Sequence, residues 1–252
     1  MNSPYSRAIA LMSDSAPLLL SQQILSVLQT RSFIHHQDRI PEKNAPLLVV
    51  SNHRSVMDVP VLMAALQRPI RFACHRYMTQ VPILKDVVTQ WGAIPLDEPT
   101  QRRHQFFQQA NQALQARQSV GIFPEGAPSM IHESTPQALH EFHRGFAHLA
   151  LKANVPDLAV LPVAIASHQE SVTNLFPVRL LSWFDPTEPL FHQAGWHPMV
   201  LYHRVTVLVG RPVWITPAQQ HDYHGKQARS LANALTEYCH TEIATLLSQG
   251  VY

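Results

Sequence analysis

The stretch LLVVSNHRSVMD, residues 47–58, places a short apolar run directly before a polar loop and a carboxylate. Leu47 to Ser51 form a continuous apolar run, which is typical of a strand buried on both faces of a sheet. Helical spacing of apolar residues follows from about Met57 to Gln67. The pattern therefore predicts a strand, a loop that carries Asn52 and His53, and a helix that begins near Asp58.

Working outward, short apolar runs continue to alternate with helical stretches. Further strands are predicted at 70–73, 93–96, 120–123, 159–166 and 200–209, and further helices at 83–91, 100–118, 145–153 and 228–247. This alternation predicts an α/β fold with a mixed, largely parallel sheet flanked by helices. In such sheets, sites form beyond the carboxyl ends of the strands. We therefore expect the site in the loops after Ser51, Leu96, Phe123 and Ala166.

The N-terminal region differs from the rest. Residues 8–29 mix apolar clusters with Ser and Gln, which predicts one or two amphipathic helices broken near Pro17. Two interpretations stay open: a helix that covers the core, and a helix that lies on a membrane surface. We expect an N-terminal helical segment at 1–44, with membrane association as one role, and a single α/β domain at 45–252.

Composition excludes several classes of protein. Of 252 residues, 46% are hydrophobic and 14% are charged, with a net charge of +2, which excludes an extended disordered chain. No run of Lys or Arg predicts a nucleic-acid partner. The sixteen histidines add partial positive charge near neutral pH, which favours anionic lipid headgroups. The sequence contains no Gly-x-Ser-x-Gly elbow, phosphate-binding loop or dinucleotide fingerprint, so hydrolase, kinase and dehydrogenase functions are not expected.

Several features of the sequence bear on its cellular compartment and indicate peripheral contact with a membrane. Cys74 and Cys239 form no metal-spaced pair, so we expect free thiols in a reducing compartment. No signal-peptide pattern begins the sequence, and the apolar runs are too short or too interrupted by proline to cross a bilayer. The expected location is the cytoplasmic face of a membrane, in peripheral contact with it.

His53 and Asp58 are the first candidate catalytic residues. If Asp58 lies in the first turn of the helix, its carboxylate can reach back to His53, accept the Nδ1 proton and leave Nε2 as a general base. This is a base and its orienting partner without a serine, so the nucleophile must come from the substrate. The alternative is a helix-capping aspartate beside an ordinary loop histidine.

A second motif, GIFPEG at residues 121–126, follows another predicted strand. Proline ends the strand and glycine permits a tight turn, so Glu125 projects from the strand end. It is a candidate for binding a hydroxyl-bearing substrate or orienting the base, and the alternative is a solvated loop glutamate. His140, His143 and His148 lack a carboxylate that completes a metal-binding set, so no metal is expected.

In this order and spacing, the two motifs resemble the glycerolipid acyltransferase family, which includes bacterial and plastid lysophosphatidate acyltransferases. The stretch VLPVAI at 160–165 is similar to the family's fourth block, and Arg144 and Gly145 are predicted to open the preceding helix. The resemblance covers about residues 45–168. It implies that His53 takes the proton from an acceptor hydroxyl, which attacks a thioester carbonyl, and that Asp58 is its partner.

The resemblance also implies the partners. The donor is expected to be acyl-CoA or acyl carrier protein, the acceptor a lysolipid, and the setting a membrane surface. Neither a cofactor nor a covalent enzyme intermediate is required. The predicted acceptor-binding residues are Glu125, Gly126, Arg102, Arg103 and Arg144.

Two departures from the family pattern bear on the acceptor. The block GAIPLDE at 92–98 ends in Glu98, where the family usually has a phosphate-binding arginine. Arg102 and Arg103, one helical turn further on, either replace it or form a surface pair. After FPEG the chain continues Ala127-Pro128-Ser129, whereas the family often has Thr-Arg-Ser.

The predicted function is therefore O-acyl transfer from a thioester to the free hydroxyl of a lysophospholipid. The first candidate acceptor is 1-acylglycerol-3-phosphate, which would give phosphatidate. The alternatives are a non-phosphate lysolipid acceptor and a catalytically weak family member that only binds lipid.

Residues 172–197 form an irregular apolar segment rich in aromatics, including Trp183 and Trp196. Two interpretations stay open. One is an excursion that packs over the core, and the other is a lipid-facing wall with tryptophans at headgroup depth.

Overall fold

The computed structural model describes residues 4–81, 84–96, 102–126, 135–186 and 188–249, without the side chains of 4–14, 102–103 and 189–190. Within these residues, one eight-stranded sheet has the order β1-β7-β6-β2-β5-β3-β4, and β8 pairs with β6 off this path. The strands are β1 (Arg31–His35), β2 (Leu47–Ser51), β3 (Ile70–His75), β4 (Ile94–Leu96), β5 (Ser119–Ile122), β6 (Ala159–Pro177), β7 (Trp196–Val209) and β8 (Val213–Trp214).

Parallel pairing dominates the centre of the sheet. Strand β2 lies between β5 and β6 and is parallel to both, and β3 is parallel to β5 and β4. Strand β7 runs antiparallel to β6, and β1 pairs with β7 in parallel. The prediction of a mixed, largely parallel sheet is confirmed.

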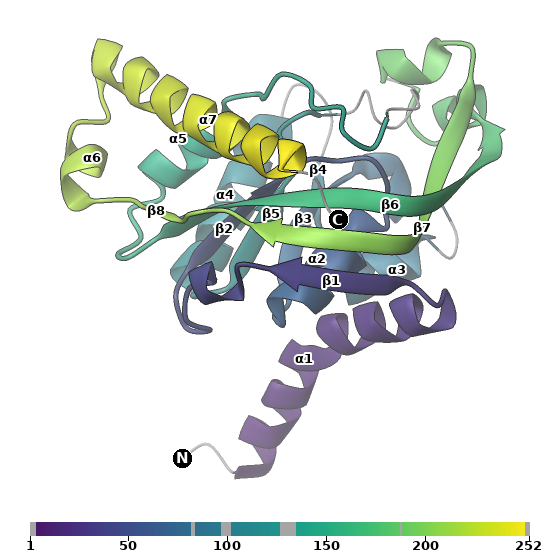
Figure 1. The fold of residues 1–252 in the computed structure, drawn as a ribbon. Coiled ribbons are helices and arrows are strands. Elements are labelled where there is room, and N and C mark those ends of the chain that lie inside the picture. The colour runs from purple at the N-terminus through teal and green to yellow at the C-terminus, as the bar shows by residue number, and fades with distance from the viewer. Residues whose placement is uncertain (1–3, 82–83, 97–101, 127–134, 187, 250–252) are drawn as a thin grey trace.

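Helices cover both faces of this sheet (Figure 1). The helices of the described residues are α1 (Pro4–Val27), α2 (Asp58–Leu66), α3 (Leu84–Gln90), α4 (Arg102–Gln115), α5 (Gly145–Lys152), α6 (Pro217–His221) and α7 (Gly225–Ser248). The first residues predicted for the helices at 83–91 and 100–118 lie outside the described residues.

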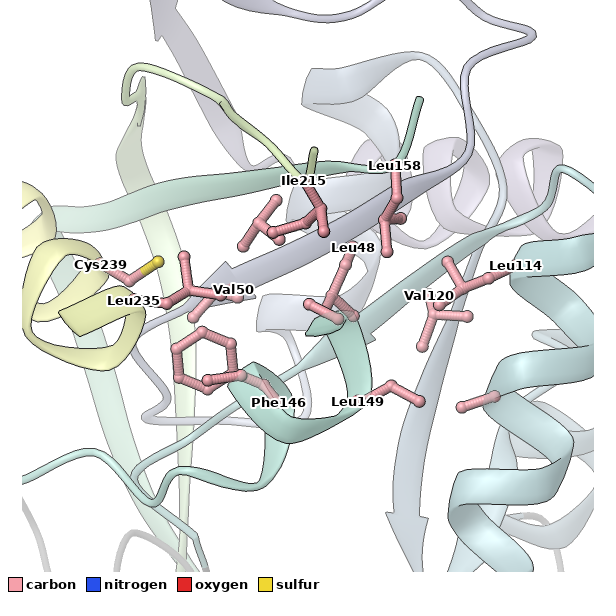
Figure 2. Close-up of a cluster of buried hydrophobic side chains, with 14 of the residues drawn as sticks. Leu48, Val50, Leu114, Val120, Phe146, Leu149, Leu158, Ile215, Leu235 and Cys239 are labelled. Atoms are coloured by element: carbon pink, nitrogen blue, oxygen red, sulfur yellow. The ribbon is translucent and has the colours of Figure 1, made fainter. Parts of the chain in front are cut away.

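The alternation of side chains along β2 divides the core in two. Leu48 and Val50 face a buried cluster that α4, α5 and α7 complete, which includes Phe146 and Leu235 (Figure 2). Leu47 and Val49 face a second cluster, completed by α1 and α2. Since successive strand residues point to opposite faces, a wholly apolar strand is the expected sequence for this central position.

Helix α1 continues through Pro17, so the predicted break there is wrong. The ribbon changes direction part-way along the helix (Figure 1), as expected for an interior proline, which removes one backbone hydrogen bond. In the part of α1 whose side chains are described, residues 15–27, Leu25 is buried and the Ser21 hydroxyl contacts Met63 Sδ of α2. This part therefore covers the core.

Two strand boundaries differ from the sequence prediction. Strand β1 lies within residues 1–44, which are predicted to form an N-terminal helical segment, yet it joins the sheet beside β7. Strand β6 runs to Pro177 instead of ending at Ala166, and β7 begins at Trp196. The predicted irregular segment 172–197 thus contains strand at both ends. These residues lack the apolar alternation that would predict a strand, and they form one because β6 and β7 pair with each other.

Among the described residues, no helix has the length and apolar content needed to cross a bilayer.

Candidate active site

The loop after β2 is held by side chains on both sides of it. Asn52 is buried, and its amide bridges the backbone of β6: Oδ1 accepts from Ile165 N at 2.8 Å and Nδ2 donates to Ile165 O at 3.0 Å. Because both partners are backbone atoms of a central strand, the start of the loop is tied to the sheet. His53 follows directly.

His53 and Asp58 are in contact. The distance from His53 Nδ1 to Asp58 Oδ2 is 2.8 Å, and the side chains are 20% and 1% exposed. Asp58 is the first residue of α2, so the turn between the loop and the helix brings the carboxylate back to the imidazole. Nδ1 is therefore the bound nitrogen, and Nε2, on the far side of the ring, is the one available to a substrate.

Asp58 accepts hydrogen bonds from four groups. Besides the imidazole, these are the backbone N–H groups of Arg54 and Ser55, at 2.7 and 2.9 Å from Oδ2, and the Tyr202 hydroxyl, at 2.6 Å from Oδ1. These donors compensate for the burial of a negative charge. They also leave the carboxylate little freedom to rotate away from His53.

Tyr202 comes from β7 and remains a donor at any ordinary pH. Burial raises the pKa of its phenol well above 10, and the neighbouring Asp58 carboxylate raises this pKa further. The hydroxyl therefore stays protonated and donates a hydrogen bond to Oδ1.

An aromatic stack packs against one face of the His53 imidazole. The Phe123 ring lies 4.1 Å from the His53 ring and nearly parallel to it, and Phe72 stacks on Phe123 at 4.9 Å. Gly121 makes room for this stack, because a Cβ at that position would lie 2.2 Å from the Phe72 ring. The site thus requires a residue without a side chain on β5.

Glu125 is a buried clamp, which contradicts the alternative of a solvated loop residue. Its Oε1 accepts from His53 N and its Oε2 from His140 N, each at 2.9 Å. The carboxylate therefore joins the His53 loop to the segment before α5. Its predicted contact with the acceptor stays a prediction.

Arg54 and Glu170 form an ion pair at the edge of the site. The guanidinium donates from Nη1 and Nη2 to the two carboxylate oxygens at 2.6 and 2.8 Å. Burial alone would raise the pKa of Glu170, but the hydrogen bonds and positive charge of Arg54 outweigh it and lower that pKa. Burial alone would lower the pKa of Arg54, but the carboxylate of Glu170 outweighs it and raises this pKa.

The Ser55 hydroxyl and the two cysteine thiols, which are candidate nucleophiles among the described residues, are engaged or buried. The Ser55 hydroxyl is buried and donates to Val200 O at 2.8 Å. Cys74 and Cys239 are free and buried, and burial raises the pKa of each thiol to about 12. The arrangement can therefore take a proton from an external hydroxyl more readily than it can form a covalent intermediate.

Comparison with known proteins agrees with this geometry. Residues 31–166, more than half of the chain, match the Acyltransferase family. The chain belongs to the Acyltransferase family. The matched stretch contains His53, Asp58 and Glu125, and also the four strands β2 to β5 that place them.

Two plant proteins are similar to this acyltransferase family member over 129 residues, or 51% of the chain. They are named 1-acyl-sn-glycerol-3-phosphate acyltransferase LPAT1, chloroplastic, from Arabidopsis thaliana, at 26% identity, and BAT2, chloroplastic, from Brassica napus, at 25%. The match spans 34% and 35% of their lengths, about a third of each. The fold is similar to the crystal structure of the 1-acyl-sn-glycerophosphate (LPA) acyltransferase PlsC from Thermotoga maritima, with a TM-score of 0.59 and 16% identity over 92% of this chain and 77% of that chain.

The structure separates the residues predicted to bind the acceptor. Gly126 follows the clamp at a positive φ of 78°, which suits a glycine. Arg144 donates to Asn233 of α7 at 2.8 Å, so its guanidinium is directed to an exposed contact with that helix instead of to Glu125. Arg102 begins α4, and the side chains of Arg102 and Arg103 are not among those that the structure describes.

The other motif residues are placed as follows. Glu98 and Ala127-Pro128-Ser129 lie outside the described residues. His148 bonds to the Tyr223 hydroxyl at 2.7 Å. Among the described residues, no cluster of His, Cys, Asp and Glu is arranged to hold a metal ion.

Sequence reasoning missed three residues of the site. Tyr202, Glu170 and Phe123 each contact the His53–Asp58 pair or its loop. Phe123 lies inside the FPEG motif, so its place beside the glutamate was a usable signal. Tyr202 and Glu170 carry no local signal, because only the pairing of β6 with β7 brings them to the loop.

Proposed function

We propose that this chain catalyses O-acyl transfer from a thioester to the free hydroxyl of a lysolipid. The first candidate acceptor is 1-acylglycerol-3-phosphate, with phosphatidate as the product. The observation that carries the proposal is the 2.8 Å contact between His53 Nδ1 and Asp58 Oδ2 beside a partly exposed ring. Membership in the Acyltransferase family and the names of the plant relatives support it.

In the proposed reaction, Nε2 of His53 takes the proton of the acceptor hydroxyl as its oxygen attacks the thioester carbonyl. The imidazole becomes positively charged, and the buried Asp58 carboxylate stabilises it through Nδ1. The C–S bond then breaks, the imidazolium returns its proton to the departing thiolate, and the ester is formed. No covalent enzyme intermediate is needed, in agreement with the burial of Ser55 and Cys74.

The proposed donors are acyl-CoA and acyl carrier protein. Because the acceptor is a lipid and both donors are water-soluble, the reaction belongs at a membrane surface. We place the enzyme there in peripheral contact, on the cytoplasmic face.

A second candidate is transfer to a lysolipid without a phosphate. The guanidinium closest in sequence to His53, that of Arg54, is held by both oxygens of Glu170. Arg144 is engaged with Asn233. Neither arginine is thus directed toward a phosphate, which favours an acceptor that needs no such contact.

The test is a thiol-release assay, run with acyl-CoA and with acyl carrier protein over a panel of phosphate and non-phosphate lysolipids. His53→Ala is expected to lower the rate by about 10²–10⁴-fold, the usual contribution of a general base. The matched control is His35→Ala, at an exposed position of β1. Equal rates for wild type and His53→Ala would refute the mechanism, and no thiol release with any acceptor would favour a lipid-binding role.

A further inference from the structure

The distal part of the β6–β7 pair, within residues 171–201, extends beyond the other strands of the sheet. Strand β2 pairs with β6 only at 159–163, and β1 pairs with β7 only at 204–208. Beyond these positions β6 and β7 pair with each other, up to Pro177 opposite Trp196. Figure 1 shows this ribbon extending past the sheet to short helical turns, which are η4 (Val178–Trp183) and η5 (Pro189–His192). We call residues 171–201 the distal ribbon.

The distal ribbon exposes large apolar side chains. Trp183 and Trp196 are 80% and 52% exposed, the largest such aromatic exposure on the described surface. The other exposed large apolar residues of the distal ribbon are Val172, Leu175, Leu180 and Phe184. Exposed apolar groups gathered on one protruding element are typical of an interaction surface.

Contacts on its inner side hold this surface in place. Val178, Leu181 and Phe191 pack with Tyr77, which lies in η2 (Arg76–Thr79) just after β3. His75 Nε2 lies 3.0 Å from Glu188 Oε2. The exposed tryptophans are therefore part of a packed element, so little conformational entropy is lost when they bind a partner.

The contacts with His75 also keep the carboxylates of the distal ribbon away from its exposed surface. Asp185 and Glu188, which are the acidic residues between 171 and 204, are both buried and directed toward His75. The exposed ionisable side chains in this range are basic: Arg179, His192, His203 and Arg204. An apolar surface with Trp and basic groups, and without exposed carboxylates, matches the interface of an anionic bilayer.

We propose that the distal ribbon docks the protein on the surface of an anionic membrane, with Trp183 and Trp196 at headgroup depth. A second copy of this chain fits less well, because a symmetric contact would place basic groups against basic groups. The inference deepens the proposed function, whose lipid acceptor it would bring to the site. The same two strands reach the site, since Glu170 holds Arg54 and Tyr202 holds Asp58.

The test measures partition of the full chain onto phosphatidylcholine vesicles with and without phosphatidylglycerol. We expect phosphatidylglycerol to increase binding, and Trp183→Ser with Trp196→Ser to weaken it by about tenfold or more. Trp214→Ser is the matched control, because Trp214 is 47% exposed on β8 and outside the distal ribbon. Arg179→Gln should reduce the effect of phosphatidylglycerol, and Arg229→Gln on α7 should not.

Three outcomes would overturn the proposal. They are unchanged partition of the double tryptophan variant with a retained melting temperature, equal weakening by Trp214→Ser, and self-association of the free protein that the double variant abolishes. Acyl transfer is measured separately with a short-chain lysolipid dissolved as monomers. Vesicle binding without any acyl transfer would refute the proposed function and leave the docking surface standing.

Discussion

Asp58 is the residue on which the geometry of the site depends. Its carboxylate binds His53 through one oxygen, while Tyr202 holds the other at 2.6 Å. A buried acceptor with a donor on each oxygen has one preferred orientation. In the proposed mechanism, Tyr202 is therefore a positioning residue, which would act on the reaction through Asp58 and His53.

Tyr202→Phe removes the hydroxyl and keeps the ring. We expect kcat to fall by about 10- to 100-fold with KM almost unchanged, since a hydrogen bond to a buried charged group contributes about 1.5–3 kcal/mol. Steady-state kinetics with the preferred acceptor measures both constants. Tyr238→Phe is the control, because that exposed hydroxyl bonds to Arg211 O, far along the chain from the His53 loop. An unchanged kcat for Tyr202→Phe would contradict the assignment.

Among the elements, strand β5 supports His53 through a glycine that leaves room for an aromatic ring. Gly121 pairs with Phe72 of β3, and the Phe72 ring occupies the volume where a side chain would be. Phe72 then stacks on Phe123, and Phe123 stacks on His53. The packing of two neighbouring strands thus sets the position of the imidazole ring.

Gly121→Ala should disturb this stack. A Cβ 2.2 Å from a buried ring forces Phe72 to move, and overpacking of this kind costs about 1–3 kcal/mol of the free energy of unfolding. The free energy of unfolding, measured by chemical denaturation, and the rate of acyl transfer should both decrease. Gly145→Ala is the control, since nothing lies within 4 Å of a Cβ there. Adding Phe72→Val to Gly121→Ala removes the ring and should recover part of the stability; no recovery would place the clash elsewhere.

At the scale of the whole molecule, the long β6–β7 pair joins the core to the site and to the distal ribbon. The ion pair between Arg54 and Glu170 ties this pair of strands to the loop after β2. Because its ion pair with Arg54 lowers the pKa of Glu170, this carboxylate stabilises the fold in its ionised form. The contribution is present above the ordinary pKa of 4.5 and is lost as the pH falls through the lowered value.

Glu170→Gln should therefore destabilise the protein in a pH-dependent way. We expect a loss of about 1 kcal/mol at neutral pH, small because the pair is only partly shielded from water, and a difference from wild type that shrinks below about pH 4.5. Urea denaturation across this pH range measures it. Glu237→Gln, at an exposed position of α7, is the control. A difference that grows toward acid pH would have the wrong sign for a lowered pKa.

The features of this protein that can be predicted from the sequence are those with local signals. The apolar run 47–51 is a central strand because both of its faces are buried, and five positions separate His53 from Asp58, so one turn into a helix suffices to join them. A predicted strand also ends just before Glu125 in the FPEG motif, so Glu125 was expected at the same edge of the sheet as His53. The side chain of Glu125 then proved to be a backbone clamp, which its position alone did not indicate.

The residues from distant strands that complete the site are brought there by long-range strand pairing. Tyr202 lies 144 positions from Asp58 and Glu170 lies 116 positions from Arg54, and both arrive through the register of an antiparallel pair whose outer half has no apolar alternation. The burial of Asp185 and Glu188 against His75 has the same origin. Long-range pairing depends on many contacts at once, whereas the spacing of a motif depends on a few neighbouring residues.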